Sequence, residues 1–142
     1  MSNSTLDLAF VDAKAVESID NAATVKITID MLDVGQFIPQ GDVALKRLRT
    51  LPKGAVRIKR PSAQIVEGTT TGSRHVWDSL AGIEVYDPPE RMKSPLVGRI
   101  YVLSKERTLT HPEHGHHVYP KGFIGVAIYQ RQFAEELRRV VD

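Results

Sequence analysis

Four of the five histidines fall between residues 111 and 117, which makes this the densest group of chemically capable side chains in the sequence. They are His111, His114, His116 and His117, and the fifth, His75, ends a Thr- and Gly-containing stretch. Neutral imidazole is the commonest protein ligand of transition metals. Two or three converging imidazoles with a carboxylate suit Zn²⁺, Ni²⁺ or Fe²⁺. The sequence therefore predicts a divalent-metal site.

The predicted ligands are His75, His111 and His114, with Glu113 as a further ligand or as a neighbour that orients an imidazole. If residues 115–119 are extended, alternate side chains face opposite ways, so all four clustered histidines cannot reach one ion. A second interpretation is structural. Thr110-His-Pro-Glu113 matches a helix capping box with Pro near the helix start, and His-rich loops also occur as solvated turns.

Charge is unevenly distributed although the net charge is only +2. Residues 1–35 contain six acidic and two basic residues, whereas residues 43–66 contain seven basic residues and no acidic one. This asymmetry indicates either pairing of the two segments, within or between subunits, or a surface for an anionic partner such as nucleic acid. We favour pairing, because no aromatic residues alternate with these charges as single-strand binding would require. The candidate partner-binding residues are Lys46, Arg47, Arg49, Arg57, Lys59 and Arg60.

The elements that must position these residues are mostly short strands. Apolar spacing predicts an amphipathic helix over residues 11–22 and a strand over 25–29. From residue 42 onward, short strands alternate with Gly- and Pro-containing turns, which favours a small β-barrel or sandwich. A short C-terminal helix is expected over residues 132–141. The predicted organisation is an N-terminal arm or subdomain, residues 1–35, and a β-domain, residues 36–142. The predicted strands beyond residue 42 span 43–48, 55–59, 64–66, 75–77, 83–86, 98–103 and 122–130.

Composition narrows the functional classes. The chain has 142 residues and no cysteine, which excludes disulfides, thiolate metal sites and a cysteine nucleophile. No apolar run reaches the roughly 18–20 residues of a membrane helix. The N-terminal residues lack the features of a signal peptide. We therefore expect a cytoplasmic protein, or a virion component made in the cytoplasm, with no membrane partner.

A series of short motifs resembles a group of small bacterial and phage proteins of unassigned function, over residues 40–142. The resemblance implies a compact, cupin-like β-barrel and a phage or mobile-element setting. In that group a further His lies two residues before the position of His75; here Ser73 occupies it, which removes one candidate ligand. The motifs, in order, are Gln40-Gly41-Asp42-Val43, Leu51-Pro52-Lys53-Gly54-Ala55, Glu67-Gly68-Thr-Thr-Thr71-Gly72-x-x-His75, His111-Pro-Glu-His114-Gly115, Pro120-x-Gly122 and Tyr129-Gln-Arg-Gln-Phe133.

Three functions are compatible with these observations. The leading hypothesis is a non-enzymatic binding or assembly protein that forms a homo-oligomer or joins other protein subunits through its acidic arm. The first alternative is an enzyme that depends on a His-ligated divalent metal. The second is a nucleic-acid-binding accessory protein that uses the basic stretch. The sequence leaves the choice open.

Overall fold

The computed structural model describes residues 16–19, 22–66 and 75–130, and these form two five-stranded sheets. Sheet A has the strand order β1-β2-β9-β8-β5, and sheet B has the order β3-β10-β7-β6-β4. The strands of sheet A are β1 (Val16–Ile19), β2 (Ala22–Lys26), β9 (His116–Tyr119), β8 (Arg107–Thr110) and β5 (Val76–Trp77). The strands of sheet B are β3 (Val43–Arg47), β10 (Ile124–Tyr129), β7 (Val97–Leu103), β6 (Ile83–Asp87) and β4 (Val56–Arg57).

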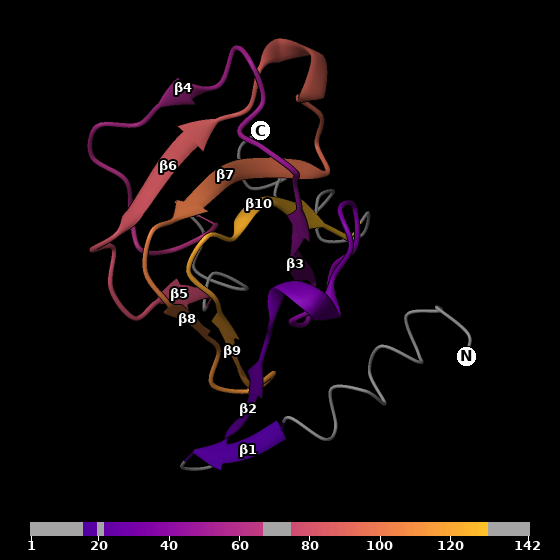
Figure 1. Cartoon of the computed structure of the whole chain (residues 1–142), viewed down its shortest axis with the longest axis vertical. Helices are drawn as coiled ribbons and strands as arrows, with labels where there is room; N and C mark the ends of the chain where they lie inside the picture. Colours follow the sequence, from indigo (N-terminus) through magenta and orange to yellow (C-terminus); the bar gives the residue numbers. More distant parts are fainter. Residues whose placement is uncertain (1–15, 20–21, 67–74, 131–142) are drawn as a thin grey trace.

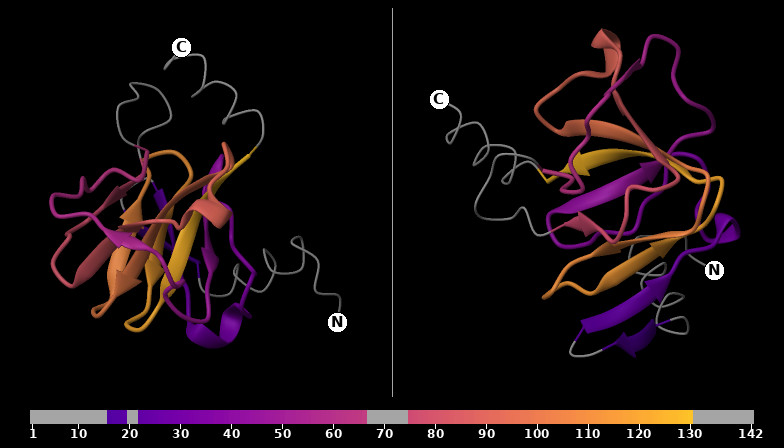
Figure 2. Two further views of the ribbon diagram at one scale, coloured as in Figure 1. Left: turned by 90° about the horizontal axis from the view of Figure 1, so that it is seen from above. Right: turned by 90° about the vertical axis from the view of Figure 1, so that its left-hand side faces the viewer.

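The two sheets pack face to face as a sandwich (Figure 1 and Figure 2). Two short 3-10 helices, η1 (Ile29–Met31) and η2 (Glu90–Met92), lie in the connections. Neighbouring strands are antiparallel except for β2 and β9, which run parallel. The predicted mainly β class is thus confirmed in its sandwich form. Within the described residues the sheets remain separate and do not close into a barrel.

Alternating apolar residues build the core between the sheets. In β6 and β9, buried side chains alternate with more exposed ones, as expected for strands with one face inward. Trp77 of sheet A contacts Tyr101 of sheet B, with ring centroids 5.5 Å apart, and both side chains are almost fully buried. Tyr119 and Phe123 continue this aromatic layer at a centroid distance of 4.7 Å. Such large aromatic side chains dominate the burial that stabilises a small domain.

The outer edge of β3 is covered by the segment that precedes it. Gly35 donates its N–H to the carbonyl of Arg47, and Arg47 donates to the carbonyl of Gln36. At the other end of β3, the N–H of Gln40 donates to the carbonyl of Val43. Residues 35–40 therefore satisfy backbone groups that would otherwise be open to another chain.

Two more edges are protected in different ways. Segment 63–65 covers β5, because Ile65 donates to the carbonyl of His75 and Trp77 donates to that of Ala63. The edge strand β4 has only two residues, and very short edge strands are poor templates for pairing. Strand β1 differs, because no described segment pairs with its outer edge.

The predicted N-terminal helix over residues 11–22 is wrong where the structure describes it. Val16–Ile19 and Ala22–Lys26 are strands that pair antiparallel with each other. An isolated short helix is marginal in water, whereas the edge of β9 offers these residues hydrogen-bond partners. The predicted C-terminal helix over 132–141 lies outside the described residues. None of the helices in the described ranges is long and apolar enough to cross a membrane.

Candidate functional site: an imidazole cluster

Register between β5 and β8 brings His75 to the cluster. Val76 pairs with Thr110, so the residues that precede and follow them, His75 and His111, lie side by side at the end of sheet A. Their ring centroids are 4.5 Å apart, and the ring of His114 lies 4.4 Å from that of His111. The structure therefore brings these three imidazoles together. His75 and His111 are buried, whereas His114 is exposed.

Gln40 fixes the protonation pattern of His75. The Gln40 Nε2 group donates hydrogen bonds to the carbonyls of Leu109 and Gly115, at 2.8 and 2.7 Å. This orientation leaves Gln40 Oε1 as an acceptor, 2.8 Å from His75 Nδ1. His75 must therefore carry its proton on Nδ1 and keep a lone pair on Nε2. An imidazole held in this tautomer can accept a hydrogen bond or bind a metal through Nε2.

His111 has the opposite pattern, and it caps a turn. Its Nδ1 accepts the backbone N–H groups of Glu113 and His114, at 3.1 and 3.0 Å. A nitrogen that accepts hydrogen bonds carries no proton, so neutral His111 carries its proton on Nε2. That nitrogen then has no lone pair for a metal. The backbone N–H of His111 in turn donates to His116 Nδ1, at 3.2 Å.

The capping interpretation of this segment needs revision. Residues 112–114 form a turn, and the helix that the Thr110-to-Glu113 pattern suggested is not present. The Thr110 hydroxyl instead donates to the carbonyl of Val76, 2.7 Å away on the neighbouring strand. The His111 ring, one residue further along the chain, takes over the N–H groups of the turn.

Burial keeps two of the histidines neutral. Loss of solvent lowers the pKa of His75 to about 3, with the nearby His111, His114 and His117 adding to the effect. Burial likewise lowers the pKa of His117 to about 4, with a smaller contribution from His116. Both imidazoles are therefore uncharged at neutral pH.

Glycine at position 41 lets His114 approach the chain. Gly41 has a φ of 64°, and a Cβ built there would lie 2.4 Å from Cδ2 of His114. The ring of His114 thus lies against the backbone of the turn that carries Gln40. The side chains of the cluster come from three places along the chain: the turn before β3, the start of β5 and the β8–β9 turn.

The described residues do not assemble a complete metal site. No group of three or more His, Asp or Glu side chains in the described ranges is placed to hold an ion. His111 Nδ1 accepts hydrogen bonds from the backbone of the turn, so it is not available to a metal. Glu113 is exposed, and its backbone N–H is one of these donors. Metal binding by His75, His111, His114 and Glu113 remains a prediction.

Sequence reasoning missed several buried polar residues. In the sequence, Gln40 stands out only as part of a short motif at a turn between predicted elements, although its side chain links three segments. Three further buried side-chain atoms have no hydrogen-bond partner in the described structure: Thr24 Oγ1, Trp77 Nε1 and His117 Nδ1. The register places His117 opposite Val25 and Thr24 opposite His116, so two of these atoms lie along the β2–β9 pairing. Local patterns carry no signal for such long-range pairs.

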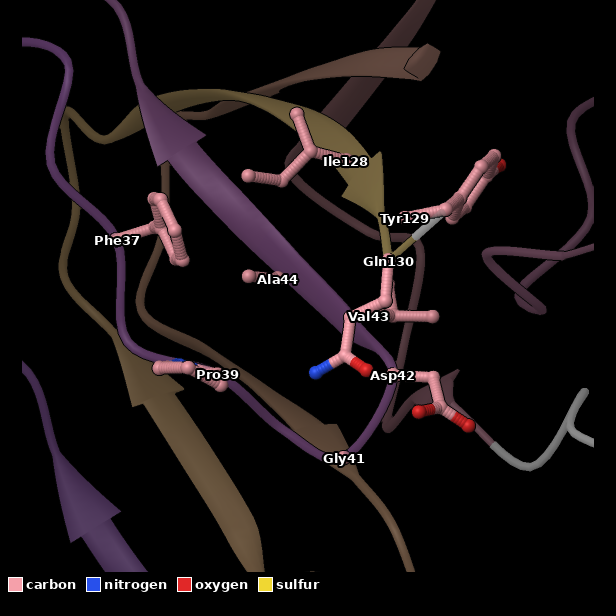
Figure 3. A pocket seen from close by; sticks show the side chains of 9 residues that line it. All are labelled: Phe37, Pro39, Gly41, Asp42, Val43, Ala44, Ile128, Tyr129 and Gln130. Atoms are coloured by element: carbon pink, nitrogen blue, oxygen red, sulfur yellow. The ribbon is translucent and has the colours of Figure 1, made fainter. Parts of the chain in front are cut away.

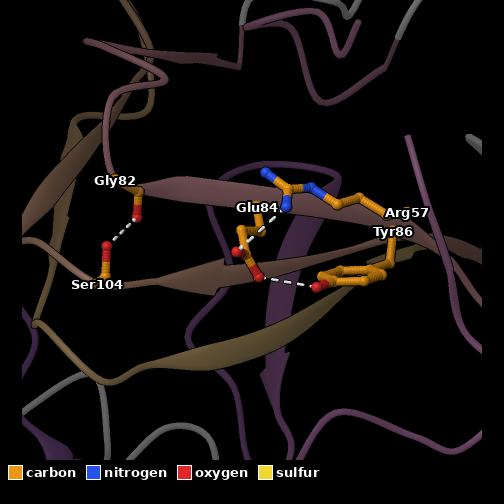
Figure 4. A network of polar contacts seen from close by, with 5 residues as sticks. All are labelled: Arg57, Gly82, Glu84, Tyr86 and Ser104. Carbon is orange, nitrogen blue, oxygen red and sulfur yellow. Dashed lines mark hydrogen bonds and ion pairs between the residues drawn. The ribbon is translucent and has the colours of Figure 1, made fainter. Parts of the chain in front are cut away.

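The six basic candidates do not act as one group. Arg47 is half-buried and donates to the carbonyls of Ile29 and Leu32, so it holds η1 against β3. Arg57 lies 3.4 Å from the carboxylate of Glu84, which also accepts a hydrogen bond from Tyr86 (Figure 4). Lys46 is half-buried on β3, whereas Arg49, Lys59 and Arg60 are exposed. Among the described residues, no ion pair joins the segment before residue 36 to residues 43–66.

Comparison with known proteins adds a family. Residues 39–129 match the family described as Domain of unknown function (DUF8820). Neither the curated proteins nor the solved structures contain a match to this chain. The matched range runs from the turn that carries Gln40 to the end of β10 and includes the whole imidazole cluster. Strands β1 and β2 lie before it.

Proposed function

We propose that this chain, which belongs to the DUF8820 family, is a non-enzymatic assembly protein that forms homo-oligomers. The family description assigns no activity, so the proposal is argued from the structure of the chain itself. The contact joins β1 of one copy to β1 of a second copy. The observation that carries this proposal is the outer edge of β1, which no described segment covers, while the edges of β3 and β5 are covered and β4 is very short.

The shape of the molecule supports pairing at this edge. Strands β1 and β2 extend sheet A beyond the rest of the sandwich, at the bottom of Figure 1. An edge strand presents a row of N–H and C=O groups, which another strand can pair with.

The sequence of β1 is compatible with pairing to itself. An antiparallel, flush register would place Val16 opposite Ile19 and Glu17 opposite Ser18 of the second copy. Like charges directly opposite each other destabilise a sheet, and this register avoids them. A second copy is therefore a suitable occupant of the edge, and the pairing would create one continuous sheet across two subunits.

The imidazole cluster supports a structural role more than a catalytic one. His111 caps its own turn, and the described residues hold no three-ligand group. The basic candidates give less support to nucleic-acid binding, since Arg47 and Arg57 are engaged within the chain. Near-stoichiometric metal in untagged protein, or a salt-dependent shift with DNA or RNA, would favour one of these alternatives.

Native mass spectrometry and light scattering of the full chain test the assembly. We expect a mass above that of the 15.8 kDa monomer, which increases with protein concentration and persists at high salt, because backbone hydrogen bonds carry the contact. A monomer at all concentrations would overturn the proposal.

Proline substitutions locate the contact. Successive residues of a strand direct their N–H groups to opposite edges, so Glu17→Pro and Ser18→Pro, made separately, remove an N–H from different sides of β1. We expect one variant to dissociate the oligomer while circular dichroism shows an intact sandwich. If both folded variants assemble like the original chain, β1 is not the interface.

A further inference from the structure

The outer face of sheet B contains a pocket of about 180 Å³ beside the start of β3 (Figure 3). Its floor is formed by Ala44 and Ile128, which are directly paired across β3 and β10. Their neighbours Val43 and Leu45 belong to the core, so this pair faces the opposite way. Phe37, Pro39, Asp42 and Gln130 also line the pocket.

The pocket has an apolar part and a polar part. Phe37 and Pro39 come from residues 35–40, which cover the edge of β3, and complete the apolar walls around Ala44 and Ile128. Asp42 and Gln130, two exposed polar residues, lie at the end of the pocket away from Phe37 in the view of Figure 3. No described Lys or Arg lies within ion-pair distance of the Asp42 carboxylate.

Backbone contacts hold the polar part in place. The N–H of Gln130 donates to the carbonyl of Asp42 at 3.0 Å, next to the paired residues Val43 and Tyr129. The carboxylate and the amide are therefore carried by adjoining strand ends. Asp42 directly precedes β3 and Gln130 directly follows β10.

We propose that this pocket binds a small organic cation, an ammonium group with a short apolar body. The carboxylate of Asp42 and the amide oxygen of Gln130 accept hydrogen bonds from the ammonium group, and the apolar body lies over Ala44 and Ile128 against Phe37. An aromatic ring also favours a nearby cation. The same carboxylate repels anions.

Size limits the ligand. Pockets for drug-sized molecules have volumes of roughly 300–1,000 Å³, and this one is smaller. Its volume leaves room for a single small organic group. Benzylamine, with one ring and one ammonium group, is a suitable probe, and benzyl alcohol has the same shape without the charge.

Titration of the full-length protein, followed by amide ¹H–¹⁵N spectra at neutral pH, tests the proposal. Benzylamine should give saturable shifts at residues 42–44 and 128–130, with a dissociation constant about two- to fivefold lower than that of benzyl alcohol, as expected for one solvent-exposed ion pair. Equal affinity for the amine and the alcohol, or an absence of saturable shifts at these residues, would overturn it.

Three variants separate charge from shape. Asp42→Asn should abolish the preference for the amine, and Ala44→Leu should block both probes by filling the pocket. Asp33→Asn removes an exposed carboxylate outside the pocket lining and should bind like the original chain. The spectrum of each variant also shows whether it is folded. If folded Asp42→Asn keeps its preference for benzylamine, the assigned site is wrong.

Discussion

Gln40 uses both ends of its side-chain amide in buried hydrogen bonds. Removing the amide takes away one buried hydrogen bond each from His75 Nδ1 and from the backbone carbonyls of Leu109 and Gly115. We expect Gln40→Ala to lower the free energy of unfolding by about 2–4 kcal/mol, because each unsatisfied buried group costs about 1–3 kcal/mol and some relaxation is expected. Urea unfolding measures this change.

Gln36→Ala is the matched control. Gln36 Oε1 accepts a hydrogen bond from the backbone N–H of Asp33 in exposed surroundings, so its loss should cost less than about 1 kcal/mol. Gln40→Glu should be at least as costly as Gln40→Ala, because a carboxylate oxygen would face two carbonyl oxygens. Equal effects of the two alanine variants would refute the role assigned to Gln40.

At the residue scale the candidate site was predictable in part. Imidazole chemistry and the density of histidines identified His75, His111 and His114, and the structure brings these three rings into contact. The tautomers were not predictable, because they depend on Gln40 and on the backbone of a turn. Gln40 lies 35 positions from His75 in sequence, so no local pattern connects them.

At the scale of elements, the turn at Gly41 combines two constraints. Its φ of 64° is unfavourable for residues with a Cβ, and its added Cβ would also collide with the ring of His114. Gly35 has a φ of 90° but nothing within 4 Å of an added Cβ. We expect Gly41→Ala and Gly35→Ala each to cost about 1–2 kcal/mol from backbone strain.

Only Gly41→Ala should disturb the imidazole cluster. The ring of His114 must move to accommodate the new methyl group, so its ¹H–¹³C resonances should shift, whereas Gly35→Ala should leave them in place. Chemical denaturation and histidine spectra of both variants make the comparison. Unchanged His114 resonances in folded Gly41→Ala would show that the ring does not rest on this turn.

The strands were more predictable than the helices. Short segments between Gly- and Pro-containing turns predicted the strands observed as β3, β6, β7 and β10. Strands β8 and β9 were not among the predicted strands, and both are only four residues long. The helix predicted over residues 11–22 was wrong because, in so short a segment, the spacing of apolar residues does not distinguish a helix from a β-hairpin. The pairing of β2 with β9, far away in the sequence, decides between them.

For the molecule as a whole, the number of short strands predicted the layered β architecture but not the assignment of strands to sheets. The chain passes repeatedly from one sheet to the other: β2 and β5 belong to sheet A, whereas β3, β4 and β6 belong to sheet B. These pairings depend on long-range burial, which composition and periodicity do not encode. One consequence of that burial is that His75 and His117 are enclosed as neutral groups.

Their burial predicts a loss of stability in mild acid. The folded-state pKa values of His75 and His117 are lowered to about 3 and about 4, below the value of 6.5 for free imidazole. Between these limits the unfolded chain binds more protons than the folded one, so stability is complete above about pH 6.5 and decreases as the pH falls. Each histidine contributes a slope of up to about 1.4 kcal/mol per pH unit.

Urea unfolding at several pH values between about 7.5 and 5 would measure this slope, in a range where most carboxylates remain ionised. We expect stability to be constant near pH 7.5 and to decrease steadily below about pH 6.5. His117→Leu replaces a buried imidazole whose Nδ1 has no described partner, so this variant should lose part of the pH dependence while His75 retains the rest. A flat profile in the original chain would show that these imidazoles can gain a proton without unfolding, and that the cluster is more open to solvent than its burial implies.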